Sequence, residues 1–315
     1  MNKMKVLVSG FDGFIGSHLI EELKKDYDVF GITNYSVAKK IKADIPFNYV
    51  DVTKHFQVKN VLNEVRPDII INLCAQSSVS RSFDRPEEYI NTNTIGVINM
   101  AENAMRCIPN LKLFIQASTP EVYGRMKEFP IKETANASPT TPYAVSKLSA
   151  DHYLMYMHQA YDFPVVLSRH ANCYGRKGGI FSHLGVIENI VTQMLKGNEI
   201  NLGDGEVRRD FIYIDDVVRW YKTLIEKGKP GNIYNFGWGR AYRIEDVAET
   251  AARLLNWKGT INYNTLPKRP GEMDCIELDT SKANKELGIA PSVSMEDGLK
   301  KVIEYWRLDE GSNKL

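Results

Sequence analysis

A tyrosine and a lysine four residues apart, Tyr143 and Lys147, form the pair with the clearest chemical meaning in this sequence. Residues at positions i and i+4 share one face of a helix, so the phenol and the ammonium should point the same way. A nearby ammonium favours the phenolate and lowers the pKa of a tyrosine. Tyr143 is therefore a candidate general base, and Lys147 is the group expected to activate it.

Two more candidates follow a predicted strand at 112–117. Thr119 stands at the carboxyl end of that strand, where its hydroxyl can hydrogen-bond the same substrate hydroxyl as Tyr143. Glu121, two residues later, suits both base and acid work if a buried position raises its pKa. Because Pro120 between them has no proton to give, the acid for any leaving group must be Glu121 or water.

The glycine-rich run at 10–16, Gly-Phe-Asp-Gly-Phe-Ile-Gly, follows a predicted strand and begins a predicted helix. Gly10 permits the tight turn, Gly13 lets the backbone approach a pyrophosphate, and Gly16 permits close packing of helix on sheet. The first-turn N–H groups and the positive end of the helix dipole suit phosphate groups. We therefore expect a dinucleotide to contact Gly10, Gly13, Phe14, Ile15 and Gly16.

The residues after the second strand bear on which nicotinamide cofactor binds. An acid there would hold the ribose 2′-OH and repel a 2′-phosphate, but the segment 31–36 contains none. Asn34 and Ser36 can donate hydrogen bonds to a phosphate, and Lys39 or Lys40 can neutralise it. The segment favours NADP, with NAD as the open alternative.

The elements that must position these groups alternate along the first half of the chain. Parallel neighbouring strands need crossover connections, so this alternation predicts a doubly wound parallel Rossmann sheet in an α/β fold. A strand at 232–236 could return to the sheet, and two helices are expected near 244–255 and 295–307. The earlier strands are expected at 5–9, 29–32, 47–52, 68–73, 112–117 and 165–169, and the helices from Phe14, at 54–65, 86–106 and 142–161.

After about residue 172 the alternation ends, which predicts a smaller C-terminal α/β domain. We expect a dinucleotide-binding domain at 1–171, to which residues near 210–240 return, and a substrate-binding domain at 172–315. With 43% apolar and 25% charged residues, the composition is that of an ordinary globular protein.

Charge and cysteine content exclude several classes of protein. The net charge of +1 creates no field for nucleic acid or an acidic membrane surface. We find neither a signal peptide nor an apolar run near the ~20 residues of a membrane span, so a cytoplasmic protein is expected. The four cysteines are far apart and form no Cys-x-x-Cys pair, so we expect reduced thiols and no metal site.

Taken together, these motifs resemble the extended short-chain dehydrogenase/reductase family, the NAD-dependent epimerase/dehydratases, in its nucleotide-sugar branch. The resemblance covers nearly the whole chain. Besides the glycine loop and the set Thr119, Tyr143 and Lys147, it is carried by the segments 72–82, 172–175, 209–217 and 269–272.

The resemblance implies roles for further residues, and the chemistry of their side chains agrees with those roles. A diphosphate favours guanidinium groups, and a ribose diol favours a carboxylate. The cofactor site would be lined by Asp51, Val52, Leu73, Ala75 and Asn93, with Tyr143 and Lys147. The nucleotide-diphosphate sugar would be held by Ser78, Asn172, Arg209, Arg269 and Glu272.

The reaction type depends on Glu121. A glutamate two residues after the threonine resembles the GDP-mannose 4,6-dehydratase type, which implies oxidation at C4, loss of water across C5 and C6, and hydride return to C6. A C4 epimerase, a 4-keto-6-deoxy-sugar reductase and a decarboxylase remain alternatives, and a non-catalytic dinucleotide sensor is a remote one. The resemblance also implies a homodimer or homotetramer.

Overall fold

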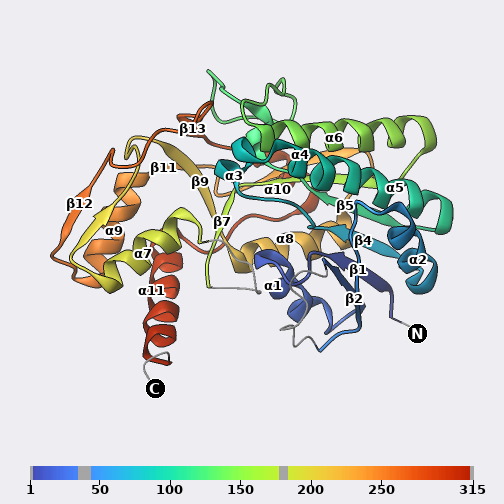
Figure 1. Cartoon of the computed structure of the whole chain (residues 1–315), viewed down its shortest axis with the longest axis horizontal. Coiled ribbons are helices and arrows are strands. Elements are labelled where there is room, and N and C mark those ends of the chain that lie inside the picture. The colour runs from blue at the N-terminus through green and yellow to red at the C-terminus, as the bar shows by residue number, and fades with distance from the viewer. Residues whose placement is uncertain (1–2, 35–43, 177–183, 313–315) are drawn as a thin grey trace.

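The computed structural model describes residues 3–34, 44–176 and 184–312, with side chains as far as Leu308. Its centre is a seven-stranded sheet in the order β10-β6-β5-β4-β1-β2-β3 (Figure 1), in which every neighbouring pair is parallel. This confirms the doubly wound α/β fold. The strands are β1 (Lys5–Ser9), β2 (Asp28–Thr33), β3 (Phe47–Tyr49), β4 (Ile69–Asn72), β5 (Leu113–Ala117), β6 (Val165–His170) and β10 (Asn232–Phe236).

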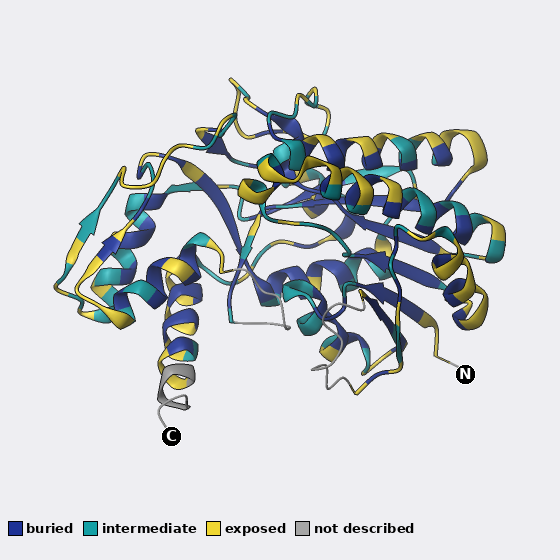
Figure 2. Ribbon diagram, viewed as in Figure 1, coloured by how far each residue is buried: buried dark blue, intermediate teal, exposed yellow. Residues whose placement is uncertain are grey.

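Helices cover both faces of this sheet, as the continuous apolar runs of its central strands require. On one face α1 (Phe14–Leu23) and α8 (Ile214–Lys227) share a core with alternate residues of the strands. On the other face α2 (His55–Val65), α5 (Gly96–Cys107) and α6 (Pro142–Tyr161) form a second core. Figure 2 shows the result: buried strands between helices whose outer faces are exposed.

The crossover from β4 to β5 differs from the single helix expected at 86–106. It consists of α3 (Val79–Asp84), α4 (Pro86–Tyr89), a π-helical turn η2 (Ile90–Ile95) and α5. Gly96, directly after the π-helical turn, is tightly packed: a Cβ there would lie 2.7 Å from Cγ2 of Val52. Such π-helical turns are frequent at functional sites.

The C-terminal half adds a small sheet and a helical layer. The small sheet has the order β11-β9-β13, and β7 also pairs with β9. Helices expected near 244–255 and 295–307 are present as α9 and α11, whereas α7, α8 and α10 were not predicted. The added elements are β7 (Asn172–Tyr174), α7 (Val186–Lys196), β8 (Glu199–Asn201), β9 (Arg208–Tyr213), β11 (Ala241–Arg243), α9 (Ile244–Leu255), β12 (Thr260–Asn262), β13 (Cys275–Ile276), α10 (Ser281–Leu287) and α11 (Met295–Ser312).

Two properties of the described residues bear on the classes of protein considered above. Within residues 3–34, 44–176 and 184–312, no helix is both long enough and apolar enough to cross a membrane. All four cysteines are free thiols, and Cys275 is the buried one among them.

Candidate active site

The glycine loop follows β1 and has a backbone conformation that side chains at Gly10 and Gly16 would prevent. Gly10 has a φ of +66°, and a Cβ there would lie 3.1 Å from the backbone nitrogen of Cys74. A Cβ on Gly16 would lie 2.3 Å from the carbonyl oxygen of Gly10. Gly10 also donates its N–H to the carbonyl of Ile32 at 2.9 Å, which fixes the loop against β2. The loop therefore needs glycine at both positions.

The start of α1 offers an anion-binding surface. Its N-cap is Gly13, and no side chain caps the first turn. The backbone N–H groups of Phe14, Ile15 and Gly16 lie in this turn, at the positive end of the helix dipole. A loop with glycine at positions 10 and 13, beside a helix N-terminus, fits a pyrophosphate, so the residues present suit a dinucleotide.

Other predicted cofactor residues surround the carboxyl ends of β2, β3 and β4. Asn34 is exposed after β2, whereas Ser36 lies outside the described residues. After β3, Asp51 accepts hydrogen bonds from the backbone N–H and the hydroxyl of Thr53 at 3.0 and 2.7 Å. Val52 is buried. Leu73 and Ala75 are half-buried after β4, and a Cβ on Gly10 would lie 3.2 Å from the carbonyl carbon of Leu73.

Asn93, also predicted to line the cofactor site, makes three hydrogen bonds within the protein. It is fully buried in the π-helical turn. Its Oδ1 accepts the N–H of Gln76 at 2.8 Å, and its Nδ2 donates to the Gln76 carbonyl and to Ser146 Oγ, both at 3.0 Å. These bonds use both protons of Nδ2 and one of the two acceptor positions of Oδ1. Asn93 therefore holds the segment after β4 against α6.

The predicted catalytic residues come together where β5 ends and α6 begins. Thr119 caps a 3₁₀ turn (Pro120–Tyr123), and its Oγ1 accepts the N–H of Glu121 at 3.3 Å. Thr141 caps α6 by accepting the N–H of Ala144 at 3.1 Å, so Tyr143 lies in the first helical turn. A hydrogen bond joins Tyr143 to Thr119.

The expected lowering of the tyrosine pKa is wrong for this arrangement of side chains. Burial, and secondarily the carboxylate of Glu121, raise the pKa of Tyr143, while the hydrogen bond with Thr119 acts in the opposite direction. Lys147 lies one turn further along α6, where burial lowers its pKa to about 8. Its Nζ donates to the carbonyl of Ala117 at 2.5 Å. The four-residue spacing puts the side chains of Tyr143 and Lys147 on one face of the helix, but burial has the largest effect on their pKa values.

A buried polar group that the sequence analysis missed lies one turn beyond the lysine. Asp151 Oδ2 accepts hydrogen bonds from Ser118 Oγ at 2.7 Å and from Arg169 Nη2 at 3.0 Å. Its Oδ1 is buried without a hydrogen-bond partner among the described residues. The charge of Asp151 opposes the effect of burial on the pKa of Lys147. The signal was available, because Tyr143, Lys147 and Asp151 are each four residues apart.

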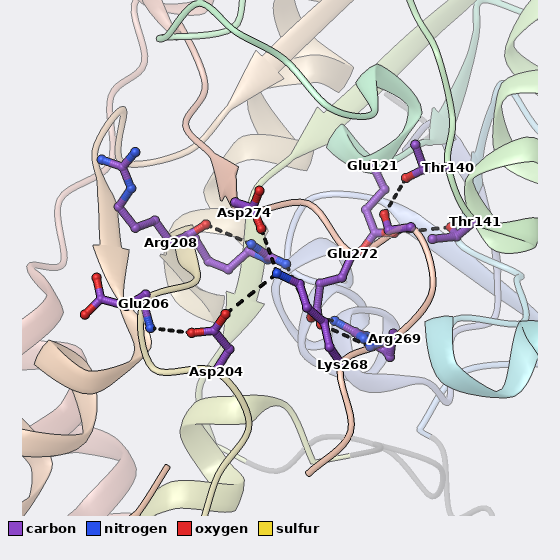
Figure 3. Close-up of polar contacts among 12 residues, drawn as sticks. Glu121, Thr140, Thr141, Asp204, Glu206, Arg208, Lys268, Arg269, Glu272 and Asp274 are labelled. Carbon is purple, nitrogen blue, oxygen red and sulfur yellow. Dashed lines mark hydrogen bonds and ion pairs between the residues drawn. The ribbon is translucent and has the colours of Figure 1, made fainter. Parts of the chain in front are cut away.

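Glu121 is the link between these residues and the C-terminal half. Burial raises its pKa, and the nearby cations Arg209 and Arg269 partly offset that effect. Thr141 Oγ1 donates to Glu121 Oε2 at 3.5 Å. Figure 3 shows Glu121 and Thr141 beside Glu272 and Arg269 from the C-terminal loop. One pocket is lined by Val79, Glu121, Thr141, Arg209, Arg269, Pro270, Gly271, Glu272 and Met273.

The predicted substrate residues divide between this pocket and its surroundings. Glu272 Oε1 pairs with Arg269 Nη2 at 2.5 Å and with Arg209 Nη2 at 3.7 Å, so the carboxylate expected at a ribose lies between the two guanidinium groups. Ser78 caps α3 by accepting the N–H of Arg81, directly before the pocket residue Val79. Asn172 is exposed on β7.

A close backbone contact holds the C-terminal loop against the start of α6. Thr140 Oγ1 donates to the carbonyl of Gly271 at 2.6 Å. Gly271 has a φ of +68°, and a Cβ there would lie 2.1 Å from the carbonyl oxygen of Thr140. The contact places Arg269 and Glu272, on either side of this glycine, next to the residues that precede Tyr143.

Comparison with known proteins agrees with this geometry. The family model described as GDP-mannose 4,6 dehydratase matches residues 7–302. The human dTDP-D-glucose 4,6-dehydratase is 30% identical, over 96% of this chain and 90% of that protein. The UDP-glucose 4-epimerase structure from Thermotoga maritima, with UDP-glucose, is 32% identical, with a TM-score of 0.91 over 98% of this chain and 100% of that one.

A dehydratase of solved structure is similar over the same extent. The dTDP-glucose 4,6-dehydratase from Streptomyces venezuelae, with NAD bound, is 26% identical, with a TM-score of 0.87 over 98% of each chain. Likeness to dehydratases and epimerases alike thus spans nearly the whole chain, and the family model spans most of it. The chain belongs to the GDP-mannose 4,6 dehydratase family, in the nucleotide-sugar branch of the extended short-chain dehydrogenases/reductases.

Proposed function

We propose that this protein is a nucleotide-diphosphate-sugar 4,6-dehydratase that works with a bound nicotinamide dinucleotide. The observation that carries the proposal is the half-buried carboxyl of Glu121 beside Tyr143, at the edge of a pocket with two arginines. Burial raises the pKa of Glu121, as suits a group that alternates between base and acid. The family model and the human relative support a dehydratase.

The dinucleotide would lie along the glycine loop, with its pyrophosphate at Gly13–Gly16 and its nicotinamide towards Tyr143. The loop fits because Gly10 and Gly16 leave no room for a Cβ. When bound, the nicotinamide supplies a hydride acceptor for C4 of the sugar and later returns that hydride to C6. The residues after 172 would bind the nucleotide sugar, while β10 joins β6 in the central sheet.

The side chains would divide the proton transfers between them. Tyr143 accepts the proton of the C4 hydroxyl, Thr119 holds that hydroxyl by a hydrogen bond, and Lys147 stabilises the phenolate. The new C4 ketone acidifies the C5 proton, which Glu121 removes. Because Pro120 has no proton to give, Glu121 also protonates the C6 hydroxyl as it leaves as water. C5 then takes a proton from solvent when the hydride adds to C6, and Tyr143 releases the proton of the C4 hydroxyl to solvent, so the protons balance. The diphosphate is held by Arg209 and Arg269.

A C4 epimerase is the second candidate, favoured by the neutral Pro120 and by the likeness to the Thermotoga maritima epimerase. Such an enzyme needs the tyrosine, the lysine and the dinucleotide but no base at C5. It would therefore leave Glu121 without a chemical role, although the carboxyl is held by Thr141 at the pocket. That assignment makes Glu121 the residue that separates the two reactions.

Two finer assignments belong to the same proposal. The neutral residues after β2, Asn34 among them, favour NADP, whereas the Streptomyces venezuelae relative has NAD bound. We also propose a homodimer or homotetramer, which is supported by the exposed apolar and aromatic side chains Val145, Tyr156 and Tyr161 on α6.

The test is incubation of the protein with GDP-mannose, dTDP-glucose, UDP-glucose, CDP-glucose and UDP-N-acetylglucosamine, followed by mass spectrometry. We expect one of them to lose a water and to gain the alkaline absorbance of a 4-keto sugar. Glu121→Gln should lose this activity by about a hundredfold or more, because the carboxamide cannot take the C5 proton. Glu128→Gln, an exposed change of the same kind a few residues later, should retain it.

Three results would contradict this proposal. Interconversion of two sugars at constant mass, unaffected by Glu121→Gln, would establish the epimerase instead. Water loss that persists in Glu121→Gln would remove the role given to this carboxyl. Consumption of added NADPH with a 4-keto sugar would indicate a reductase.

A further inference from the structure

One acidic side chain lies inside the glycine loop and was not assigned a role above. Asp12 stands between Gly10 and Gly13 and is 8% exposed. Its Oδ2 accepts a hydrogen bond from Thr33 Oγ1 at 2.8 Å. Thr33 is the last residue of β2. The carboxylate of Asp12 therefore lies at the carboxyl end of β2, although it belongs to the loop after β1.

That position matters because the end of β2 is where a Rossmann sheet meets the adenosine ribose. A carboxylate there accepts a hydrogen bond from the ribose 2′-OH and repels a 2′-phosphate. In this chain β2 ends in the neutral Thr33, and the neutral Asn34 follows it. Asp12 brings the missing charge to the same place from another element. A carboxylate accepts about four hydrogen bonds, and the Thr33 hydroxyl uses one of these positions.

The loop holds Asp12 there through its neighbour Phe11. The Phe11 ring packs against Gly31 of β2, where a Cβ would lie 2.5 Å from Cδ1 of the ring. Phe11 is 1% exposed and contacts the ring of Phe47, with centroids 5.3 Å apart. The main chain at Asp12 is thus fixed on β2 from two sides, by an apolar ring and by a hydrogen bond.

The charges around this edge of the sheet point the same way. Asp51, after β3, adds a second carboxylate. Burial raises the pKa of the Cys74 thiol, after β4, to about 12, and the charges of Asp12 and then Asp51 act in the same direction. Lys147, the cation that opposes them there, donates to the carbonyl at the end of β5. Within the described residues, an added 2′-phosphate would therefore meet these two carboxylates on the β2 side, while Lys39 and Lys40 lie outside that part of the chain.

We propose that Asp12 selects NAD against NADP by accepting the ribose 2′-OH and repelling a 2′-phosphate. The proposal rests on the proposed use of a nicotinamide dinucleotide and reverses the preference that the residues after β2 suggest. It requires nothing of the sugar or of the reaction type.

The test is calorimetric titration of NAD and of NADP into protein freed of any cofactor retained during purification. We expect wild-type protein to bind NAD at least about tenfold more tightly, since like charges in contact cost at least that much. Asp12→Asn, which keeps the shape and can still bond Thr33, should reduce this ratio about tenfold or more, mainly by tighter NADP binding. Asp28→Asn, an exposed change of equal charge at the other end of β2, should leave the ratio within about twofold.

Equal or tighter binding of NADP by wild-type protein would overturn the assignment, and so would an unchanged ratio in Asp12→Asn. If Asp12→Asn does not fold, Thr33→Val serves instead, because it frees the carboxylate from its anchor and should also reduce the ratio. A protein that binds neither dinucleotide would defeat the proposed function itself, whereas binding without selectivity would defeat the role of Asp12 alone.

Discussion

At the scale of single residues, burial is the strongest influence on the chemistry of this site. Tyr143 and Lys147 are both enclosed, so burial raises the pKa of the tyrosine and lowers that of the lysine to about 8. The two pKa shifts favour the neutral phenol of Tyr143 and the neutral amine of Lys147 over the phenolate and the ammonium. The ion pair that base catalysis requires must therefore be stabilised by groups brought against it, and a positively charged nicotinamide is one such group.

The lysine makes a prediction for stability against pH. Its pKa falls from 10.5 to about 8 on folding, so between these values the unfolded chain binds more protons than the folded one. Below about pH 8 the buried lysine is charged, and its burial lowers the free energy of unfolding by the full amount. As the pH rises from about 8 towards 10.5, the folded protein holds the neutral amine and this loss of stability disappears. Relative to Lys147→Met, wild-type protein should thus gain roughly 3 kcal/mol of unfolding free energy over this interval.

Denaturant unfolding of both proteins at a series of pH values measures that gain. The matched control is Lys301→Met, since the side chain of Lys301 is exposed on α11 and its ammonium stays in contact with water on folding. A constant difference between wild type and Lys147→Met from pH 7 to about 11 would mean that Lys147 keeps an ordinary pKa in the folded protein.

At the scale of elements, the site depends on backbone contacts that only glycine allows. Gly16→Ala would bring a Cβ to 2.3 Å from the Gly10 carbonyl oxygen, so α1 must shift away from the loop. Because the proposed pyrophosphate site consists of that loop and the first turn of α1, we expect dinucleotide affinity to fall about a hundredfold or more. Calorimetric titration with NAD and NADP measures the loss.

The same substitution at another helix end separates this effect from a general cost. Gly197 ends α7 with an extended backbone, and the nearest atom to a Cβ there is 4.0 Å away. Gly197→Ala should therefore keep both fold and affinity. Unchanged dinucleotide binding by Gly16→Ala would show that the pyrophosphate lies elsewhere.

At the scale of the whole molecule, local patterns in the sequence predicted what local structure determines. The glycine loop and the helical pair Tyr143 and Lys147 are present as structural features, because each depends on residues close in sequence. The parallel sheet is confirmed as well, because the alternation of strands and helices is a local pattern that requires crossover connections. The strands β12 and β13 are too short to show periodicity, and α8 follows β9 without a turn residue between them. The bond from Thr33 to Asp12 and the pairing of Glu272 with two arginines depend on folding. No sequence spacing encodes those contacts.

The pocket itself is a property of the whole chain, since the 3₁₀ turn after β5 contributes Glu121 and the small sheet contributes Arg209. Arg209 is 6% exposed, and its guanidinium lies among the carboxylates Glu121 and Glu272. A diphosphate would need this cation as its counter-charge. Arg209→Met should therefore raise the KM for the nucleotide sugar about tenfold or more.

The neighbouring arginine provides the comparison, because Arg208 is exposed on the other face of β9. Arg208→Met should change KM by less than about twofold. Titration of the dinucleotide into each of the two variants completes the design. Because the pocket at Arg209 does not include residues of the glycine loop, we expect the dinucleotide affinity to stay constant in both. A rise in KM for Arg208→Met alone would place the diphosphate on the outer face of β9, and with it the sugar outside the reach of Tyr143. The comparison of Arg209→Met with Arg208→Met therefore tests whether the two halves of the chain form one active site.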